Sequence, residues 1–72
     1  MRTNSAAAFV TSQFEIRFES LFHHGRGLVF PCDRDGVVDV DTLSERARSN
    51  YFFARATLGR EYASPRVVPL LS

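Results

Sequence analysis

The stretch TLSERARSNYFFARATLG, residues 42–59, has the clearest pattern in the chain and predicts a helix over about residues 42–58. Its apolar residues recur at spacings of three and four and form one stripe along a helix: Leu43, Ala47, Tyr51, Ala54 and Leu58. Thr42 and Glu45 fit a capping box, and Asp41 is the rival N-cap. Gly59 stands where a left-handed cap is expected at the end of the helix.

Upstream of this helix, the sequence predicts short strands joined by turns. In QFEIRF, residues 13–18, apolar and charged residues alternate with the period of a half-buried strand. HHGRG, residues 23–27, supplies a glycine-rich turn, and residues 28–30 form a second short strand that ends at Pro31. The β-branched valines within residues 37–40 favour a third strand.

These elements predict an α+β fold in which a meander of two or three antiparallel strands is followed by one long C-terminal helix. We expect a flexible N-terminal arm at residues 1–12 and a single domain at residues 13–62. Pro65 and Pro69 interrupt the remaining residues, 63–72, which we expect to form an extended C-terminal tail.

The size of the chain limits what the domain can do alone. Seventy-two residues allow one domain, and a chain this short has a thin core that dimerisation often completes. One cysteine, Cys32, excludes an intrachain disulfide, and no stretch has the length or apolar character of a membrane span or a secretory signal. We therefore expect a cytoplasmic protein, and the net charge of +1 gives no general attraction to nucleic acid or anionic lipid.

Two phenylalanines of the helical stretch suggest a partner. Phe52 and Phe53 lie outside the apolar stripe, where a monomeric helix normally carries polar residues. Either the C-terminal residues 67–71 or a second copy of the chain must cover them, and the small core favours a homodimer. The interface residues predicted on this basis are Tyr51, Phe52 and Phe53, with Arg48 and Arg55 at the rim. An unidentified protein could take the place of the second copy.

The alternative function is that of a nucleic-acid-binding regulatory protein, with an arginine surface assembled by the dimer. Residues 46–60 carry four arginines and no acidic residue, a local charge of +4. Residues 33–45 carry five acidic residues and one arginine, a local charge of −4, which would repel a phosphate backbone. Only two of the four arginines share a face of the helix, so nucleic acid is the weaker alternative.

The side chains that could form a metal or catalytic site are those of His23, His24, Cys32 and Asp33. Imidazole and thiolate groups suit zinc, but adjacent residues of an extended chain point in opposite directions, so at most one histidine faces Cys32. As a nucleophile Cys32 would need a lowered pKa, whereas the neighbouring Asp33 raises the pKa of its thiol. We therefore predict no catalytic residue, no cofactor and no metal site.

Two stretches, GRGLVFPCDRDGVVDVDTLSERAR (residues 25–48) and NYFFARATLGREY (residues 50–62), suggest a relationship to other proteins. With the residues around them, from Phe14 to Tyr62, they resemble a family of short bacterial proteins without an assigned function. The resemblance implies that the unit of strands, turn and helix recurs in other chains. It implies no activity and transfers no site residue.

Overall fold

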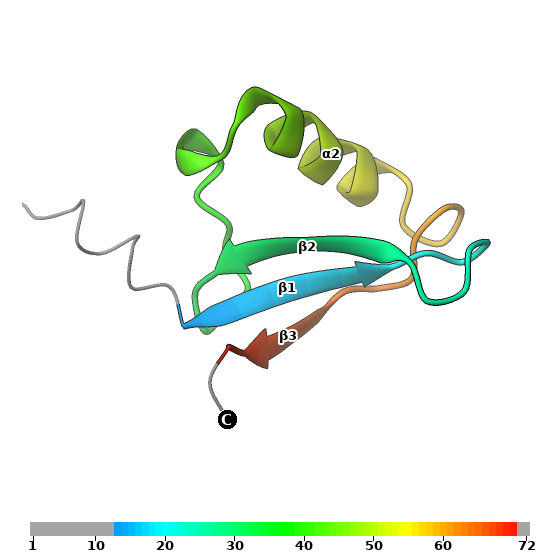
Figure 1. Cartoon of the computed structure of the whole chain (residues 1–72), viewed down its shortest axis with the longest axis horizontal. Coiled ribbons are helices and arrows are strands. Elements are labelled where there is room, and N and C mark those ends of the chain that lie inside the picture. The colour runs from blue at the N-terminus through cyan, green and yellow to red at the C-terminus, as the bar shows by residue number, and fades with distance from the viewer. Residues whose placement is uncertain (1–12, 71–72) are drawn as a thin grey trace, which may run out of the picture.

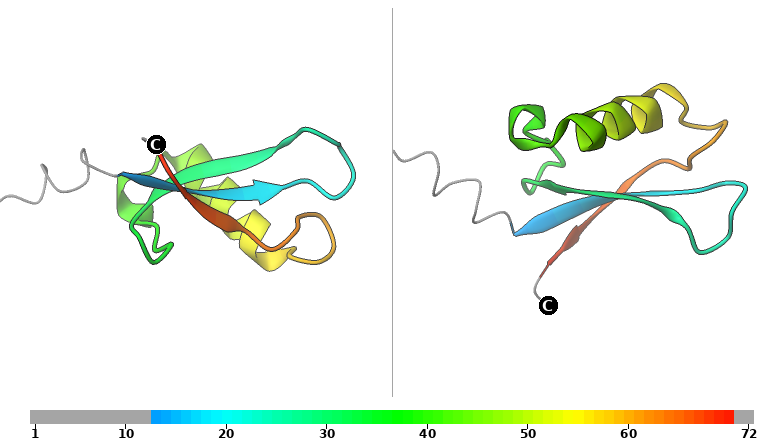
Figure 2. Two further views of the ribbon diagram at one scale, coloured as in Figure 1. Left: turned by 90° about the horizontal axis from the view of Figure 1, so that it is seen from below. Right: turned by 45° about the horizontal axis from the view of Figure 1, so that its top comes forward.

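A three-stranded antiparallel sheet with one helix on one of its faces makes up the computed structural model, which describes residues 13–70 (Figure 1). The elements in chain order are β1 (Phe14–Glu19), β2 (Gly27–Cys32), the 3-10 helix η1 (Val40–Thr42), α2 (Glu45–Ala56) and β3 (Arg66–Pro69). The strands lie in the order β2-β1-β3, and the α+β class is confirmed. The predicted meander with a C-terminal helix is wrong, because α2 precedes the last strand and β3 returns to the free side of β1 (Figure 2).

The hairpin of β1 and β2 follows from the alternation of the sequence. Ile16 and Phe18 of β1 are buried, while Arg17 between them and Glu19 after them are exposed, as expected for a half-buried strand. In the register of the pair, Ile16 lies opposite Phe30, so the buried residues of both strands share one face. The second strand is longer than predicted: it passes through Pro31, which an edge strand tolerates, and ends at Cys32.

The third strand is not where the sequence placed it. After β2 the side chain of Asp33 accepts hydrogen bonds from the amides of Asp35 and Val37, both at 2.9 Å. Gly36 adopts a φ of 84°, which a β-branched residue would not adopt without strain. These local bonds fold the segment into a turn, so the valines of residues 37–40 form no strand. The third strand, β3, comes instead from residues predicted as the extended tail.

The helix begins later than predicted. Its N-cap is Ser44, whose Oγ accepts a hydrogen bond from the amide of Ala47 at 3.1 Å. Thr42 belongs to η1, where its hydroxyl donates to the carbonyl of Asp39. The predicted cap at Thr42 or Asp41 is therefore wrong, because both residues belong to the 3-10 helix Val40–Thr42. Gly59 has a left-handed φ of 84°, but α2 ends at Ala56 and its C-cap is Thr57, so the helix also ends earlier than the predicted residue 58 and Gly59 does not cap it.

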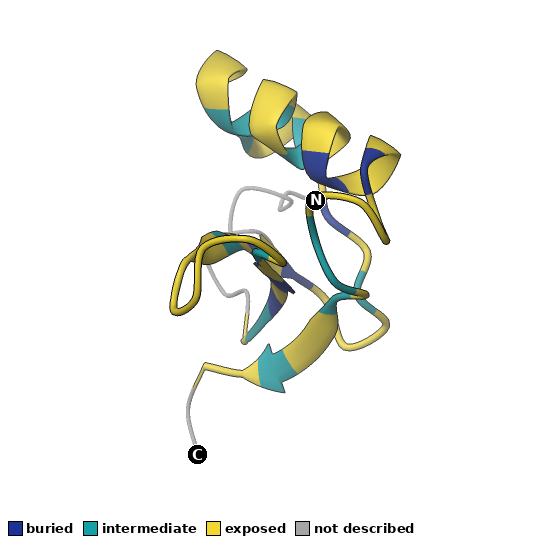
Figure 3. Cartoon of the chain, turned by 90° about the vertical axis from the view of Figure 1, so that its right-hand side faces the viewer, coloured by how far each residue is buried: buried dark blue, intermediate teal, exposed yellow. Residues whose placement is uncertain are grey.

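The core lies between α2 and the sheet, as the dark residues of Figure 3 show. Three aromatic rings form its centre: Phe18 of β1, Phe30 of β2 and Tyr51 of α2. Their centroids are 5.2–6.1 Å apart and each pair meets edge to face. Ala54 is fully buried at the point where the helix approaches the strands, because its small side chain permits a close contact. The outer side of α2 and much of the opposite face of the sheet are exposed (Figure 3).

Two expectations concern the ends of the chain and the membrane. The predicted N-terminal arm, residues 1–12, lies outside the described residues. Among residues 13–70, no helix combines the length and the apolar character that crossing a membrane requires.

Candidate interaction surfaces

Phe52 and Phe53 are the most prominent apolar side chains on the exposed part of α2. Their exposed fractions are 53% and 51%. Consecutive residues of a helix point about 100° apart, so the two rings face different sides. Phe52 contacts the ring of Tyr51, with centroids 5.7 Å apart, and Phe53 contacts the ring of Tyr62 at 6.2 Å. Each ring is held from one side by its own chain and open to solvent on the other.

The C-terminal segment does not cover these rings. Val67 and Val68 belong to β3, where they lie opposite Ile16 and Glu15 of β1. The amide of Leu70 then donates to the carbonyl of Gln13 and extends the same pairing. The C-terminal segment was one of the two predicted ways to cover Phe52 and Phe53. Over its described length it pairs with β1 instead, so it does not cover them.

The other predicted interface residues take different positions. Tyr51 is half buried among the core rings and offers little surface to a partner. Arg48 is also half buried, and its Nε donates to the carbonyl of Val40 at 3.1 Å. This hydrogen bond of Arg48 links the first turn of α2 to η1. Arg55 is exposed in the last turn, in a position suited to the rim of an interface.

A second apolar surface, which the sequence analysis did not identify, lies at the loop between β1 and β2. Leu21 is 48% exposed and Phe22 is 68% exposed. The amide of Leu21 donates to the carbonyl of Glu61 at 2.9 Å, and Ser20 pairs with Tyr62, the residue that contacts Phe53. The loop and the Phe53 side of α2 therefore lie at the same end of the molecule. The signal in the sequence was the break in alternation after Glu19, where two apolar residues follow each other.

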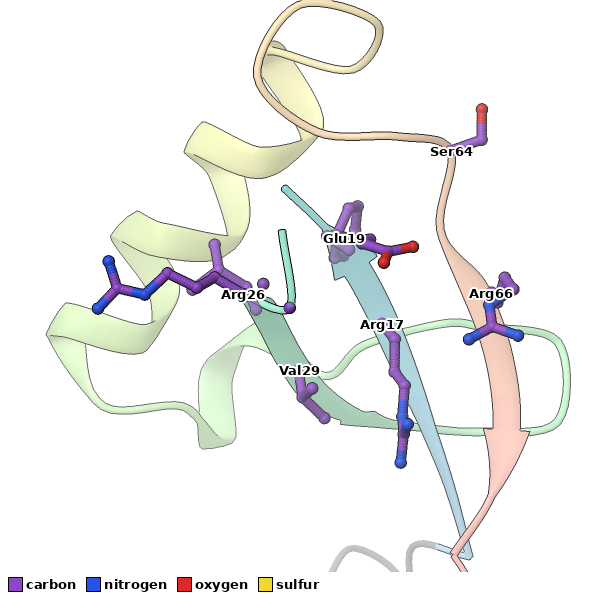
Figure 4. A pocket seen from close by; sticks show the side chains of 10 residues that line it. Arg17, Glu19, Arg26, Val29, Ser64 and Arg66 are labelled. Atoms are coloured by element: carbon purple, nitrogen blue, oxygen red, sulfur yellow. The ribbon is translucent and has the colours of Figure 1, made fainter. Parts of the chain in front are cut away.

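The uncovered face of the sheet holds an open hollow of about 380 Å³. Arg17, Glu19, Val29, Ser64 and Arg66 are among the residues that line it (Figure 4). Arg17 lies directly opposite Arg66 in the β1–β3 register, and its guanidinium bonds to the carboxylate of Glu15 at 2.6 Å. Like charges directly opposite each other in a sheet repel, and the Glu15 carboxylate neutralises only one of the two arginines.

Arg26 also lines the hollow, but Figure 4 shows its side chain directed away from Arg17 and Arg66. The carboxylate of Glu19 shares the hollow with the arginines. The result is a surface of mixed charge with a small excess of arginine, and it differs from the arginine surface on the helix that the sequence analysis considered.

Cys32 and the histidines lie far apart. His24 belongs to the loop between β1 and β2, and Cys32 ends β2, so most of a strand of about 17 Å separates them. The thiol is 3% exposed and faces the core. Burial raises its pKa, and the carboxylates of Asp33 and Glu15 raise it further. Within residues 13–70, no group of three or more His, Cys, Asp or Glu side chains is placed to hold a metal ion.

Comparison of the chain with protein-family models, curated proteins and solved structures finds no match. The resemblance of the Phe14–Tyr62 region to short bacterial proteins therefore stays a prediction.

Proposed function

We propose that the protein is a small non-enzymatic interaction module that works as a homodimer, with Phe52 and Phe53 as apolar anchors and Arg55 at the rim. The observation that supports this proposal is that both rings, on the outer part of α2, are about half exposed to solvent. The other half of each ring already contacts a tyrosine of the same chain. Burying a phenylalanine side chain is worth about 1.5–3 kcal/mol, so covering the open halves would contribute substantially to association.

The contacts of the rings with Tyr51 and Tyr62 strengthen the proposal. A side chain already held on one side loses less conformational entropy when a partner covers the other side. Anchors of this kind, large aromatic residues beside an arginine, are enriched at protein interfaces. The buried thiol of Cys32, with its raised pKa, is unsuited to nucleophilic catalysis, which favours a binding role.

Sedimentation equilibrium of the whole chain tests the homodimer. We expect a dimer at high micromolar concentration, and we expect Phe53→Glu or Phe52→Glu to raise its dissociation constant at least about tenfold. The two variants are made separately because the rings face different sides. Val37→Glu is the matched control, since Val37 is equally apolar and 61% exposed but lies in the turn after β2. A wild-type chain that remains monomeric would contradict the proposal.

A second candidate function, nucleic-acid binding through an arginine surface assembled by a dimer, has one observation in its favour. Arg66 stands opposite Arg17 on the open face without a carboxylate partner of its own within residues 13–70. A phosphate group would relieve the repulsion between the two arginines. Binding to random duplex DNA that weakens steeply with salt, and that Arg66→Gln reduces while Arg34→Gln does not, would support this function. Absence of binding at low salt would remove it.

A further inference from the structure

The free edge of β2 presents backbone groups whose direction can be worked out from the register. Hydrogen-bonded and non-hydrogen-bonded pairs alternate along an antiparallel ladder, and an edge residue of a non-hydrogen-bonded pair points its N–H and C=O away from the sheet. The amide of Ser20 donates to the carbonyl of Arg26 at 2.9 Å, so that pair is hydrogen-bonded. Counting from it along the β1–β2 register, the outward residues of β2 are Gly27, Val29 and Pro31.

The position of Pro31 agrees with this assignment. Proline has no N–H, and here it lies opposite Glu15 in a pair that needs no hydrogen bond from it. Gly27 and Val29 therefore present the free donors of this edge, and all three outward residues present carbonyls. The same three residues are exposed, Val29 by 52%.

The opposite edge, β3, is closed to a further strand. The amide of Leu70 donates to the carbonyl of Gln13 at 2.8 Å, which marks a hydrogen-bonded pair between the ends of β3 and β1. Counting from this pair, Pro69 and Val67 point outward, followed by Pro65 just before the strand. Val67 is thus the single outward donor between two prolines, and prolines protect an edge from strand addition.

We propose that β2 pairs edge to edge with β2 of a second copy of this chain, antiparallel and centred on Val29. In this register each Val29 exchanges two hydrogen bonds with its counterpart, and each Gly27 amide donates to the carbonyl of Pro31 in the other copy. All outward donors of β2 find an acceptor. The missing donor of Pro31 leaves only the Gly27 carbonyl of the other copy without a partner.

The charges at the two ends of β2 suit the same register. Arg26 lies one residue before the strand and Asp33 one residue after it. Antiparallel pairing brings the Arg26 end of each copy to the Asp33 end of the other. Among the described residues, the ion pair of Arg17 with Glu15 is the single one formed, so Arg26 has no carboxylate partner there. Asp33 forms no ion pair there either, and its carboxylate keeps its charge while Oδ1 accepts from the amides of Asp35 and Val37.

This inference rests on the proposed homodimer and adds a strand-to-strand contact to it, while the Phe52 and Phe53 variants test the helix contact separately. The two copies are related by rotation about an axis perpendicular to the sheet, so both α2 helices lie on the same side of one continuous six-stranded sheet. The two Val29 side chains cover each other on the opposite face. Val29, which is exposed at the centre of the free edge of β2, then packs against Val29 of the second chain.

The test compares the same substitution on the two edges of the whole chain. Val29→Pro removes the two central donors, whose N–H groups point away from β1, and should raise the dimer dissociation constant about 30-fold in sedimentation equilibrium. Val67→Pro is the matched control, since its N–H also points outward but on β3. We expect this control to leave the dissociation constant unchanged. Circular dichroism confirms that both variants fold.

A second variant keeps the proposal testable if Val29→Pro fails to fold. Val29→Lys retains the backbone donors but places two like charges opposite each other at the centre of the pairing, so it should also weaken the dimer. A dimer unaffected by either Val29 variant would overturn the β2 geometry while the homodimer itself stands. An equal loss with Val67→Pro would overturn it as well, whereas a monomeric wild type would contradict the proposed function itself.

Discussion

The two faces of the sheet are built from alternate residues of the same strands, yet they have different roles. On the face toward α2, Phe18 and Phe30 are buried against Tyr51. On the other face, Arg17 and Val29 are exposed beside an open hollow. The stability of the chain therefore depends on one face, and the other face tolerates change. Such separation lets a chain of 72 residues keep a core while leaving surface for binding.

The largest expected difference is between neighbouring residues of β1. Phe18→Ala should reduce the free energy of unfolding by about 3–5 kcal/mol, because it removes a fully buried ring and leaves a cavity. Small domains have little stability to spare, so we expect this variant to be largely unfolded. Arg17→Ala, one residue earlier and on the other face, should cost less than about 1 kcal/mol. Urea denaturation measures both, and equal losses would contradict the division between the faces.

Cys32 provides an intermediate effect on the covered face. Cys32→Ser should cost about 1–3 kcal/mol, because it buries a hydroxyl in place of a thiol among apolar side chains. Cys32→Ala is the control that carries no polar atom. A serine variant as stable as the alanine variant would show that the hydroxyl finds a partner or that the site is open to water.

The same thiol makes stability depend on pH. The pKa of Cys32 is raised in the folded chain by burial and by nearby carboxylates, so the folded state holds its proton more tightly than the unfolded state. The stabilisation is complete below the pKa of an unfolded cysteine, about 8.5, and is lost as the pH rises through the folded pKa. The melting temperature of the wild type should therefore fall more between pH 8 and pH 10 than that of Cys32→Ala. Parallel curves would contradict this prediction.

The helix that covers the core depends on its cap. Ser44→Ala should cost about 1 kcal/mol, since the Oγ of Ser44 satisfies the amide of Ala47. Thr42→Ala is the matched comparison, because Thr42 bonds within η1 instead. Thermal melts should rank Ser44→Ala as the more damaging change, and the reverse ranking would place the helix start at residue 42.

The smallest effect is expected on the open face. Glu15→Gln weakens the ion pair with Arg17, which is worth at most about 1 kcal/mol because the guanidinium is half exposed. The difference from wild type should shrink further as salt is added. A loss as large as that of Cys32→Ser would mean that the open face also contributes to the core.

Local structure could be predicted from the sequence better than the pairing of the strands. Alternation identified β1, and the apolar stripe identified the helix, because both signals depend on neighbours in the sequence. The valines at residues 37–40 favour a strand by composition, but they form none because the side chain of Asp33 accepts hydrogen bonds from two backbone amides and turns the chain. The pairing of β3 with β1 could not be read from periodicity, since it joins residues about fifty positions apart.

For the candidate surfaces too, local features could be predicted from the sequence, but contacts between distant residues could not. Phe52 and Phe53 were singled out by their angle on the helix, and that angle is a local property. The role of Arg48 was missed because its acceptor, the carbonyl of Val40, comes close only after η1 folds. No role was predicted for Leu21 and Phe22, although the break in alternation before them could have indicated an exposed loop.

The prolines that flank Val67 also determine how many chains a strand-to-strand assembly can contain. A sheet with two open edges can add copies without end, which is how fibrils grow. Here one edge is closed by Pro65 and Pro69, so a chain that pairs through β2 has no second edge to offer. In the proposed assembly growth would stop at two chains, and that number would be set by residues on the opposite edge of the sheet from the contact.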